Sequence, residues 1–491
     1  MQDAAVESTS PGATTIGTLG GLRLLHVDQP GRTKATLHVG VGWADETMAT
    51  RGVTHLVEHL VMHGTSRGRF ESNAAVLMHR TAFWAAGRPE LVATFLREVV
   101  AGITSPSFED LEHEAKVLAA EQSEAGFGPH DAARHTRFGN EGPGLSMIWG
   151  TGPQAAERDV LADHVRRWFV RDNAVLTVVG PLPEGLDLDL PPGAVPVRPF
   201  VQTSRPGVVG SSEGAGPVLS FVLPDGPVVP ALVGAICTRL EDELRHGQGD
   251  VYSLEPDVER LPGTGRVLVQ LGARVAPGAQ RAVAEAMARE LARRTEVGVT
   301  DDERSEMLEW WDAGNEERDP VDDLDEAAAR LLAGLPVLTY AEARAEAAEL
   351  EPAAVAVIAQ EALHGAQLLV PSGIEPDTAL PDGTGCSMSR VMTTPPMRRR
   401  FRASAAKGSA LGFDGQRVEF RDTDGDVHTI ELGEVVGVGV DGRARQLFGA
   451  RGCFITVDPR DFSGADAVVT AIDAEVSADL RFDLKAWLGQ D

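Results

Sequence analysis

The clearest chemical motif in this sequence is a pair of histidines four residues apart with a glutamate directly before the second. His55 and His59 lie in a stretch whose apolar residues recur at helical spacing, so their imidazoles share one face of a helix. Two imidazoles placed in this way can bind one metal ion. Glu58 stands beside His55, where its carboxylate can take a proton from water at the ion without binding the metal itself. The pattern therefore predicts metal-assisted hydrolysis.

A catalytic zinc site needs a third protein ligand and one open position. Our candidate is Glu121, which follows Glu114 by seven residues, about two turns, in a helix predicted over 108–124. We expect Glu121 to complete a His, His, Glu site and Glu114 to orient a histidine or support the base. A metal site that uses His63 stays open, although the helix dipole also favours a histidine at a helix end.

The segments around the motif predict a mixed α and β domain. Residues 34–41 alternate apolar and polar side chains, which predicts a half-buried strand. The helix with the two histidines is expected over 52–64, and Ser107 can cap the helix over 108–124. Residues 172–180 (DNAVLTVVG) predict a buried strand.

The order of predicted elements divides the chain into domains. A strand, helix, strand, helix, helix order in the second part echoes the first, and stretches rich in proline and glycine predict linkers. The final part changes to short strands with Asp-Gly turns and one amphipathic helix near 464–478. We predict a disordered N-terminus (1–14), a metal-binding domain (15–190), a linker (191–205), a second domain without the motif (206–375), another linker (376–400) and a C-terminal domain (401–491).

Composition limits the classes of partner. The formal net charge of −28 repels phosphate groups, so we expect no nucleic-acid partner and no binding to an anionic membrane. No stretch of about 18 apolar residues is free of charge, so no membrane span is predicted. The first residues lack the basic and apolar regions of a signal peptide. Three widely spaced cysteines, Cys237, Cys386 and Cys453, then predict free thiols in the cytoplasm.

The motif and its neighbours resemble the zinc segment of pitrilysin/insulinase-type peptidases, which are inverzincins. Residues 42–46 (GWADE) and 52–65 (GVTHLVEHLVMHGT) resemble that family's turn and zinc helix. Residues 114–121 (EAKVLAAE) resemble its later motif, in which the second glutamate is the third zinc ligand and the first supports it. The resemblance implies about one Zn²⁺ per chain, held by the two histidines and Glu121.

Three further segments carry weaker resemblances. Asn73 and Ala74 resemble the family's edge strand, which pairs with the substrate backbone. Arg245 and Tyr252 resemble a pair that reaches over the zinc from the second domain and holds the substrate carbonyl. Residues 401–491 are similar to a bacterial pleckstrin-homology-like domain, for which we expect a docking role.

The resemblance covers about residues 15–375, one subunit of the shorter, mitochondrial-processing-peptidase-like members. Those members close two subunits into a clamshell, which implies a homodimer or a heterodimer with a related subunit. His59 and Glu121 are 62 positions apart, fewer than is usual in the family, so we expect a thinner chamber wall. The implied fold is α+β: two pitrilysin-like domains, each an antiparallel-rich sheet packed by helices, and then a small β-barrel capped by a helix.

The predicted function is that of a zinc metalloendopeptidase with Glu58 as general base. Tyr252, with Arg245, is expected to stabilise the oxyanion, and the peptide to lie as an added strand near Asn73. The alternative is a catalytically inactive pitrilysin-like subunit that binds peptide or partners a second chain. A third class is a scaffold built around the C-terminal domain.

Overall fold

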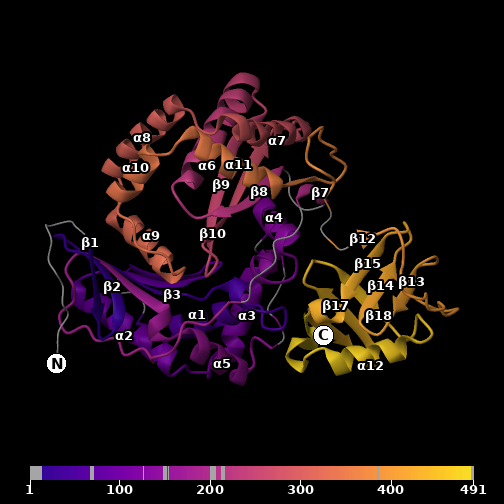
Figure 1. The fold of residues 1–491 in the computed structure, drawn as a ribbon. Coiled ribbons are helices and arrows are strands. Elements are labelled where there is room, and N and C mark those ends of the chain that lie inside the picture. Colours follow the sequence, from indigo (N-terminus) through magenta and orange to yellow (C-terminus); the bar gives the residue numbers. More distant parts are fainter. Residues whose placement is uncertain are drawn as a thin grey trace.

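The computed structural model describes residues 14–66, 71–124, 126–147, 152, 154–198, 206–211, 216–383, 386 and 388–487. They form three domains, coloured indigo to magenta, magenta to orange, and orange to yellow in Figure 1. The predicted disordered segment 1–14 lies outside the described residues except for Thr14, which begins the first strand. Among the described residues, no helix is long and apolar enough to cross a membrane.

The first domain contains a six-stranded mixed sheet in the order β1-β2-β6-β3-β5-β4. Strands β2 and β6 are parallel, and every other neighbouring pair is antiparallel. The buried strand predicted over 172–180 is β6, which confirms that prediction. The strand predicted over 34–41 is β3, but it is almost fully buried rather than half-buried, because helices cover both faces of its sheet. The strands are β1 (Thr14–Leu19), β2 (Leu22–Val27), β3 (Thr33–Val39), β4 (Glu71–Val76), β5 (Thr81–Gly87) and β6 (Ala174–Val179).

Helices of the first domain share one hydrophobic core with one face of this sheet. The helix expected over 52–64 is α1, and the helix expected over 108–124 is α3, which begins three residues later than predicted. The helices are α1 (Val53–His63), α2 (Pro89–Thr104), α3 (Leu111–Glu124), α4 (Pro129–Phe138), α5 (Arg158–Trp168) and the short η1 (Trp43–Asp45), η2 (Gly142–Met147) and η3 (Arg171–Asn173).

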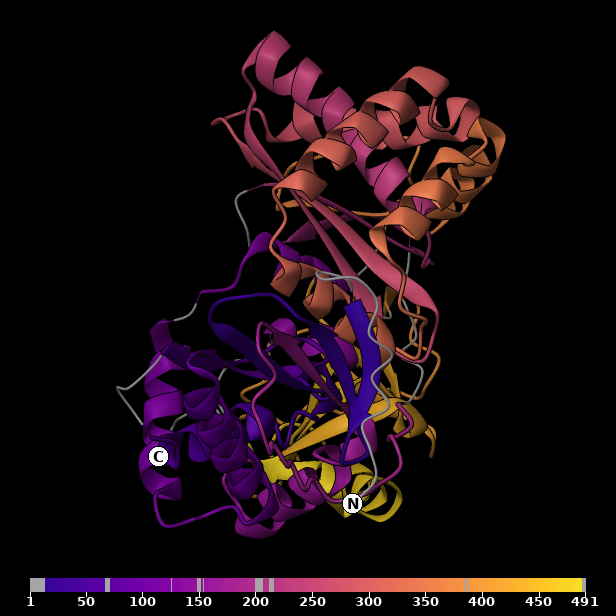
Figure 2. The same ribbon diagram turned by 90° about the vertical axis from the view of Figure 1, so that its left-hand side faces the viewer.

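The second domain repeats this plan with a five-stranded sheet in the order β7-β11-β8-β10-β9. Its strands are β7 (Gly207–Ser211), β8 (Val218–Pro224), β9 (Val251–Leu261), β10 (Arg266–Val275) and β11 (Gln367–Pro371). Its helices are α6 (Val228–Leu240), the π-helix η4 (Glu241–Gln248), α7 (Gln280–Val297), α8 (Asp301–Glu316), α9 (Pro320–Leu332), α10 (Tyr340–Ala348) and α11 (Pro352–His364). In the view of Figure 2, this domain lies above the first domain.

Each of these two domains covers the second face of the other's sheet with a helix. Leu324 and Ala328 of α9 pack against β2 and β6, which explains why β6 is buried along its whole length. In return, Ala132 and Ala133 of α4 pack against β7, β8 and β11. The buried guanidinium of Arg137 donates to the carbonyl oxygens of Ser220 at 2.6 Å and Gly365 at 3.1 Å. The two domains are therefore joined by two buried interfaces.

The C-terminal domain consists of two four-stranded sheets around one core, together with a helix near the position predicted. The first sheet holds β12 (Met388–Ser389), β13 (Ala410–Phe413), β14 (Arg417–Arg421) and β15 (Val427–Glu431). The second holds β16 (Val435–Asp441), β17 (Ala444–Gly449), β18 (Phe454–Val457) and β19 (Arg481–Asp483). The helices are α12 (Ala465–Glu475), α13 (Leu484–Trp487) and the short η5 (Leu432–Glu434) and η6 (Ala478–Leu480).

The cysteines correct one prediction. Cys386 and Cys453 were expected as free thiols, but they form a disulfide with a Cα–Cα distance of 4.9 Å. Of the segment 376–400, predicted as a linker, residues 388–400 fold back on the C-terminal domain and contribute β12 to its first sheet. This return brings together two cysteines that are 67 residues apart, which spacing alone could not reveal. Cys237 is free, as predicted.

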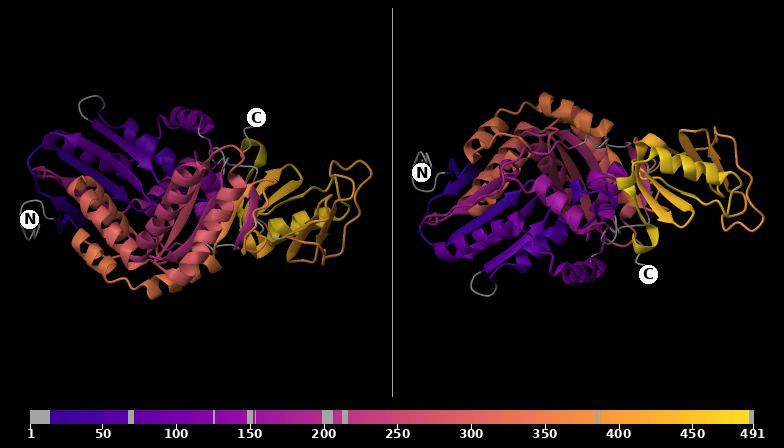
Figure 3. Two further views of the ribbon diagram at one scale, coloured as in Figure 1. Left: turned by 90° about the horizontal axis from the view of Figure 1, so that it is seen from above. Right: turned by 90° about the horizontal axis from the view of Figure 1, so that it is seen from below.

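The C-terminal domain lies to one side of the other two (Figure 3) and contacts the loop that precedes α1. Met48 of that loop is fully buried in a cluster with Phe448 and Phe482. Gln154 of the first domain donates to the carbonyl of Arg481 at 2.8 Å. The segment that leads into the histidine helix is therefore held from the C-terminal domain.

Shortening the buried Met48 side chain tests this contact. Met48→Ala is expected to lower the free energy of unfolding by about 2–4 kcal/mol, because it leaves a cavity between two domains. Met388→Ala is the matched control, since Met388 is 42% exposed. Urea unfolding measures both variants. Equal effects of the two substitutions would contradict a packing role for Met48.

Candidate active site

A buried carboxylate fixes the start of α1. Glu46 accepts hydrogen bonds from the backbone N–H groups of Gly52 at 2.7 Å and Thr54 at 2.9 Å. It also pairs with Arg51 at 3.0 Å. Gly52 has φ of 88°, a left-handed conformation that favours glycine. An anion that satisfies free N–H groups at a helix N-terminus stabilises that end, so Glu46 sets where the histidine helix begins.

The structure brings together the three residues predicted as metal ligands. One ligand atom each from His55, His59 and Glu121 lies within 4.8 Å of the others. The Glu121 carboxylate is 3.4 Å from His59 Nε2 and 3.9 Å from His55 Nε2. Donor atoms around a tetrahedral zinc ion are about 3.4 Å apart, so this donor set fits zinc. Glu121 is 54% exposed, which leaves one side of the site open to water and substrate.

Behind these residues lies a layer of hydrogen-bonded acids and imidazoles. Buried Glu114 accepts from His59 Nδ1 at 3.1 Å and from His63 Nδ1 at 2.7 Å. The other ring nitrogen of His63 is 3.4 Å from Asp110. A carboxylate on Nδ1 directs Nε2 of His59 toward the ion, which is the orienting role predicted for Glu114. His63, for which a ligand role was left open, ends α1 and faces these acids.

Glu58 lies at the edge of the three ligands and is almost fully buried. One of its oxygens is 3.4 Å from His55 Nε2. Burial raises the pKa of Glu58 to about 7, and the nearby carboxylates of Glu121 and Glu114 add to the rise against the opposing effect of His59. A cation between the histidines would favour the charged carboxylate again, because opposite charges attract.

Glu121 reaches the two histidines although the chain between His59 and Glu121 is shorter than is usual in the family that the sequence resembles. Helix α3 presents Leu111, Ala115 and Leu118 on the face that packs into the core of the first domain. Because residues three, four and seven apart share a helix face, the same packing holds Glu114 and Glu121 toward α1. The shortened connection therefore leaves the position of the third ligand intact.

His164 of α5 adds a buried imidazole beside the first turn of α1. Its Nε2 lies 3.0 Å from the Thr54 hydroxyl. Burial lowers the pKa of His164 to about 4, below the value of about 6.5 in an unfolded chain. Between these two values the unfolded state binds more protons, so the folded state loses stability as the pH falls.

This difference predicts a measurable effect of pH. From pH 7 to pH 5, the free energy of unfolding should fall by about 2 kcal/mol more in the wild type than in His164→Gln, which removes the titrating group. Urea unfolding at the two pH values gives this difference. The control is His246→Gln, which replaces an exposed histidine. A difference between the wild type and His164→Gln that does not change with pH would refute the prediction.

The predicted substrate strand lies at a free edge of the first sheet. Strand β4, which contains Asn73 and Ala74, pairs only with β5 within the described residues. Its side chains alternate between exposed and half-buried, and α1 packs beside it. An edge strand with unpaired backbone groups can accept an added strand.

The remaining two predicted residues are not joined to this site. Arg245 lies in η4, and Tyr252 lies in β9 with 76% of its surface exposed. Within the described part of the chain, no hydrogen bond or ion pair connects either residue to α1 or α3. Their role in holding substrate stays a prediction from the resemblance.

Sequence reasoning missed three residues that support the site: Glu46, Asp110 and His164. Glu46 belongs to the GWADE turn noted above, and its fixed distance before α1 was the available signal. Asp110, which lies just before α3, was not considered as a partner of His63. His164 carried no signal, because its partner Thr54 is 110 positions away.

No protein-family model matches the chain. The chain is 25% identical over 358 residues to an uncharacterised zinc protease of Streptomyces coelicolor. The matched region covers 61% of this chain and 77% of that protein.

Solved structures give the fold. The chain superimposes on pitrilysin with a TM-score of 0.59 at 16% identity, over 76% of this chain and 46% of pitrilysin, so it spans about half of pitrilysin's length. It superimposes on an inactive M16 peptidase domain of Pseudomonas fluorescens with a TM-score of 0.58 at 13% identity, over 74% of this chain and 99% of that one. The chain therefore has the α+β fold of pitrilysin and of an M16 peptidase domain, and its sequence is similar to that of a zinc protease.

Proposed function

We propose that the chain is a zinc-dependent endopeptidase that hydrolyses unfolded peptides. The observation that carries the proposal is the convergence of His55, His59 and Glu121 on one point, with the Glu58 carboxylate beside it. The ligand set leaves the open position that a catalytic zinc site needs. The similarity to a zinc protease supports the same reaction class.

The chain's own residues supply the proton transfers. When bound, the ion supplies positive charge that makes water more acidic and polarises a peptide carbonyl. Glu58 takes the proton of the attacking water and later passes it to the leaving amine. Glu114 keeps the His59 ring in the orientation that directs Nε2 outward. Arg245 and Tyr252 are proposed to hold the substrate carbonyl, on the strength of the resemblance alone.

The proposed substrate is an extended segment of peptide. Such a segment can add to the edge of β4 beside Asn73 and Ala74, because backbone hydrogen bonds bind any sequence in the same way. A folded protein offers few free backbone groups, so we expect unfolded chains to be preferred. The proposed assembly, a homodimer or a heterodimer with a related subunit, also rests on the resemblance.

Removal and return of metal tests the proposal. The purified chain, incubated with a mixture of unfolded peptides, is expected to cleave them, to stop after treatment with a chelator, and to recover with added zinc. Mass spectrometry of the products locates the cleaved bonds. Cleavage that is unaffected by the chelator would refute a metal-dependent mechanism.

The alternative is an inactive subunit that binds peptide or partners a second chain. An inactive domain with the same fold favours keeping it in view. A zinc-loaded chain that binds peptides but cleaves none of them would support this alternative.

A further inference from the structure

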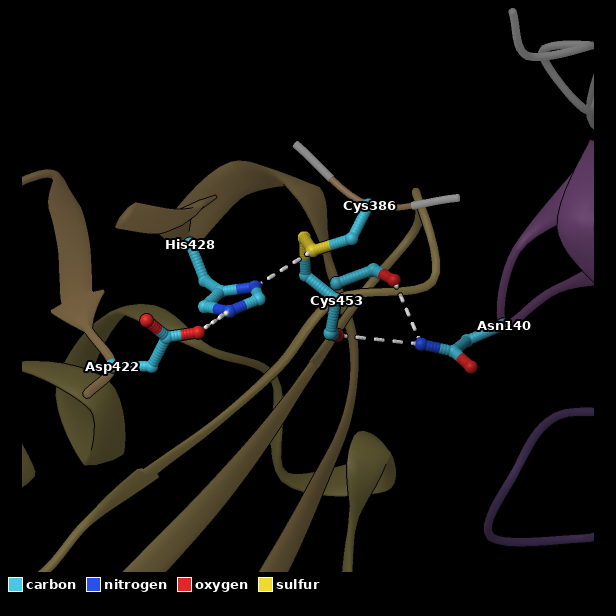
Figure 4. Close-up of a disulfide and its surroundings, with 6 residues drawn as sticks. Asn140, Cys386, Asp422, His428 and Cys453 are labelled. Carbon is cyan, nitrogen blue, oxygen red and sulfur yellow. Dashed lines mark hydrogen bonds and ion pairs between the residues drawn. A yellow bond between two sulfur atoms is a disulfide. The ribbon is translucent and has the colours of Figure 1, made fainter. Parts of the chain in front are cut away.

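The C-terminal domain holds a second group of metal-binding atoms, far in sequence from the first. Cys386 and Cys453 each offer a sulfur and His428 offers a ring nitrogen, and these atoms lie within 4.8 Å of one another. Cys386 comes from the segment before β12, His428 from β15, and Cys453 from the turn before β18. Figure 4 shows the imidazole facing the disulfide that joins the two cysteines.

The orientation of His428 is that of a metal ligand. Its Nδ1 lies 3.3 Å from the Cys386 sulfur, and its Nε2 lies 3.4 Å from Oδ2 of Asp422. Oδ1 of Asp422 is held by the backbone N–H groups of Asp424 and Asp426, both at 2.9 Å. Asp422 is therefore fixed with one oxygen toward the ring. Histidines that bind metals usually donate their second ring N–H to such a carboxylate.

We propose that Cys386, His428 and Cys453 form a second metal site, which binds one thiophilic divalent ion such as Zn²⁺ when the disulfide is reduced. Two thiolates and one imidazole, with water in the fourth position, are a known tetrahedral zinc set. In such a set the sulfurs are about 3.8 Å apart and each lies about 3.6 Å from the nitrogen. The present Sγ to Nδ1 distance of 3.3 Å is close to this value. This proposal does not depend on the proposed peptidase activity.

The site has two exclusive states, because the same two sulfurs serve both. A thiol reductant breaks the S–S bond by giving two electrons and two protons to Cys386 and Cys453, and the reductant becomes a disulfide. Binding of the ion then displaces the two thiol protons. Either state ties the segment before β12 to the turn at Cys453. That turn contacts the first domain, since Asn140 Nδ2 donates to the carbonyls of Gly449 at 2.9 Å and Cys453 at 3.4 Å (Figure 4).

Cobalt is a suitable probe because a thiolate ligand gives Co²⁺ a charge-transfer band that a His, His, Glu site cannot give. Titration of the reduced full chain with Co²⁺ is expected to produce this band and to saturate it by about two added ions per chain, because the His, His, Glu site also takes Co²⁺ without adding to the band. Added Zn²⁺ should reverse it. The chain with its disulfide intact should give no band. A thiol reagent, applied to a separate sample, checks that all three cysteines are reduced. If they are and the untreated sample still gives no band with Co²⁺, the proposal is overturned.

Single substitutions assign the ligands. Cys386→Ser and Cys453→Ser are each expected to abolish the band, whereas Cys237→Ser, the matched control, should leave it unchanged. His428→Ala should weaken Co²⁺ binding at least tenfold, and Asp422→Asn should weaken it about 10–100-fold through the orientation of the ring. A band of equal strength in Cys386→Ser, or one lost in Cys237→Ser, would place the thiolate elsewhere and overturn the assignment.

Discussion

Replacing Glu58 with glutamine is expected to lower kcat for peptide hydrolysis by about a thousandfold, the usual range for loss of a general base. The amide has the shape of the carboxylate but cannot accept the proton of the attacking water. Because Glu58 is outside the three ligand residues, the variant should keep its zinc. The measurements are kcat on a fluorogenic peptide and the zinc content of the same sample.

The control for this prediction is Glu112→Gln. Glu112 is exposed on α3 and pairs only with Lys116 in the described structure, so its replacement should change neither quantity. Full activity in Glu58→Gln would rule out Glu58 as the base. Loss of zinc together with activity would instead make Glu58 a ligand.

Local patterns in the sequence, together with the resemblance, predicted which three side chains would lie close together. The helical spacing of His55 and His59 holds wherever their helix lies, and the spacing of Glu114 and Glu121 holds in the same way. The resemblance related these two helices to each other. The structure supplied what spacing cannot, namely the packing of Leu118 and its neighbours that brings the two helices into contact.

Features that depend on distant parts of the chain could not be predicted. The helix α9, with its small residues Ala327 and Ala328, covers the face of β2 and β6 that is turned away from the first domain's own helices, yet α9 is in the second domain. The disulfide was missed because free thiols were assumed for widely spaced cysteines, whereas the return of the segment 376–400 brings Cys386 to Cys453. Both features form only when segments that are far apart in the sequence come together in the fold.

The edge strand of the first sheet could be predicted from the sequence only in part. The alternation of residues in β4 is readable in the sequence, but its position at the edge depends on the pairing order of all six strands. The resemblance carried that information for Asn73. Within the described residues, no comparable geometry joins Arg245 and Tyr252 to the site, so these two assignments depend on the resemblance more than any others.

Glu121→Ala is expected to lower the affinity for zinc by more than a hundredfold and to abolish hydrolysis. Glu121 supplies the only oxygen donor of the three ligands, and the two imidazoles left on one helix cannot surround the ion. Loss of an orienting partner costs about 10–100-fold in affinity, so Glu114→Gln should fall in that range and Glu121→Ala below it. Competition with a chromophoric chelator measures the zinc affinity of the wild type and of both variants.

The order of these zinc affinities distinguishes a residue that binds zinc from one that only orients a ligand. Glu112→Ala, on the same helix but exposed, should bind zinc like the wild type and so exclude a general effect of charge loss on α3. A larger loss in Glu114→Gln than in Glu121→Ala would exchange the two roles and bring His63, the other partner of Glu114, back as a ligand. If the wild type itself binds no zinc, the shortened connection before α3 has separated the two helices in solution, and the inactive subunit becomes the better account of this chain.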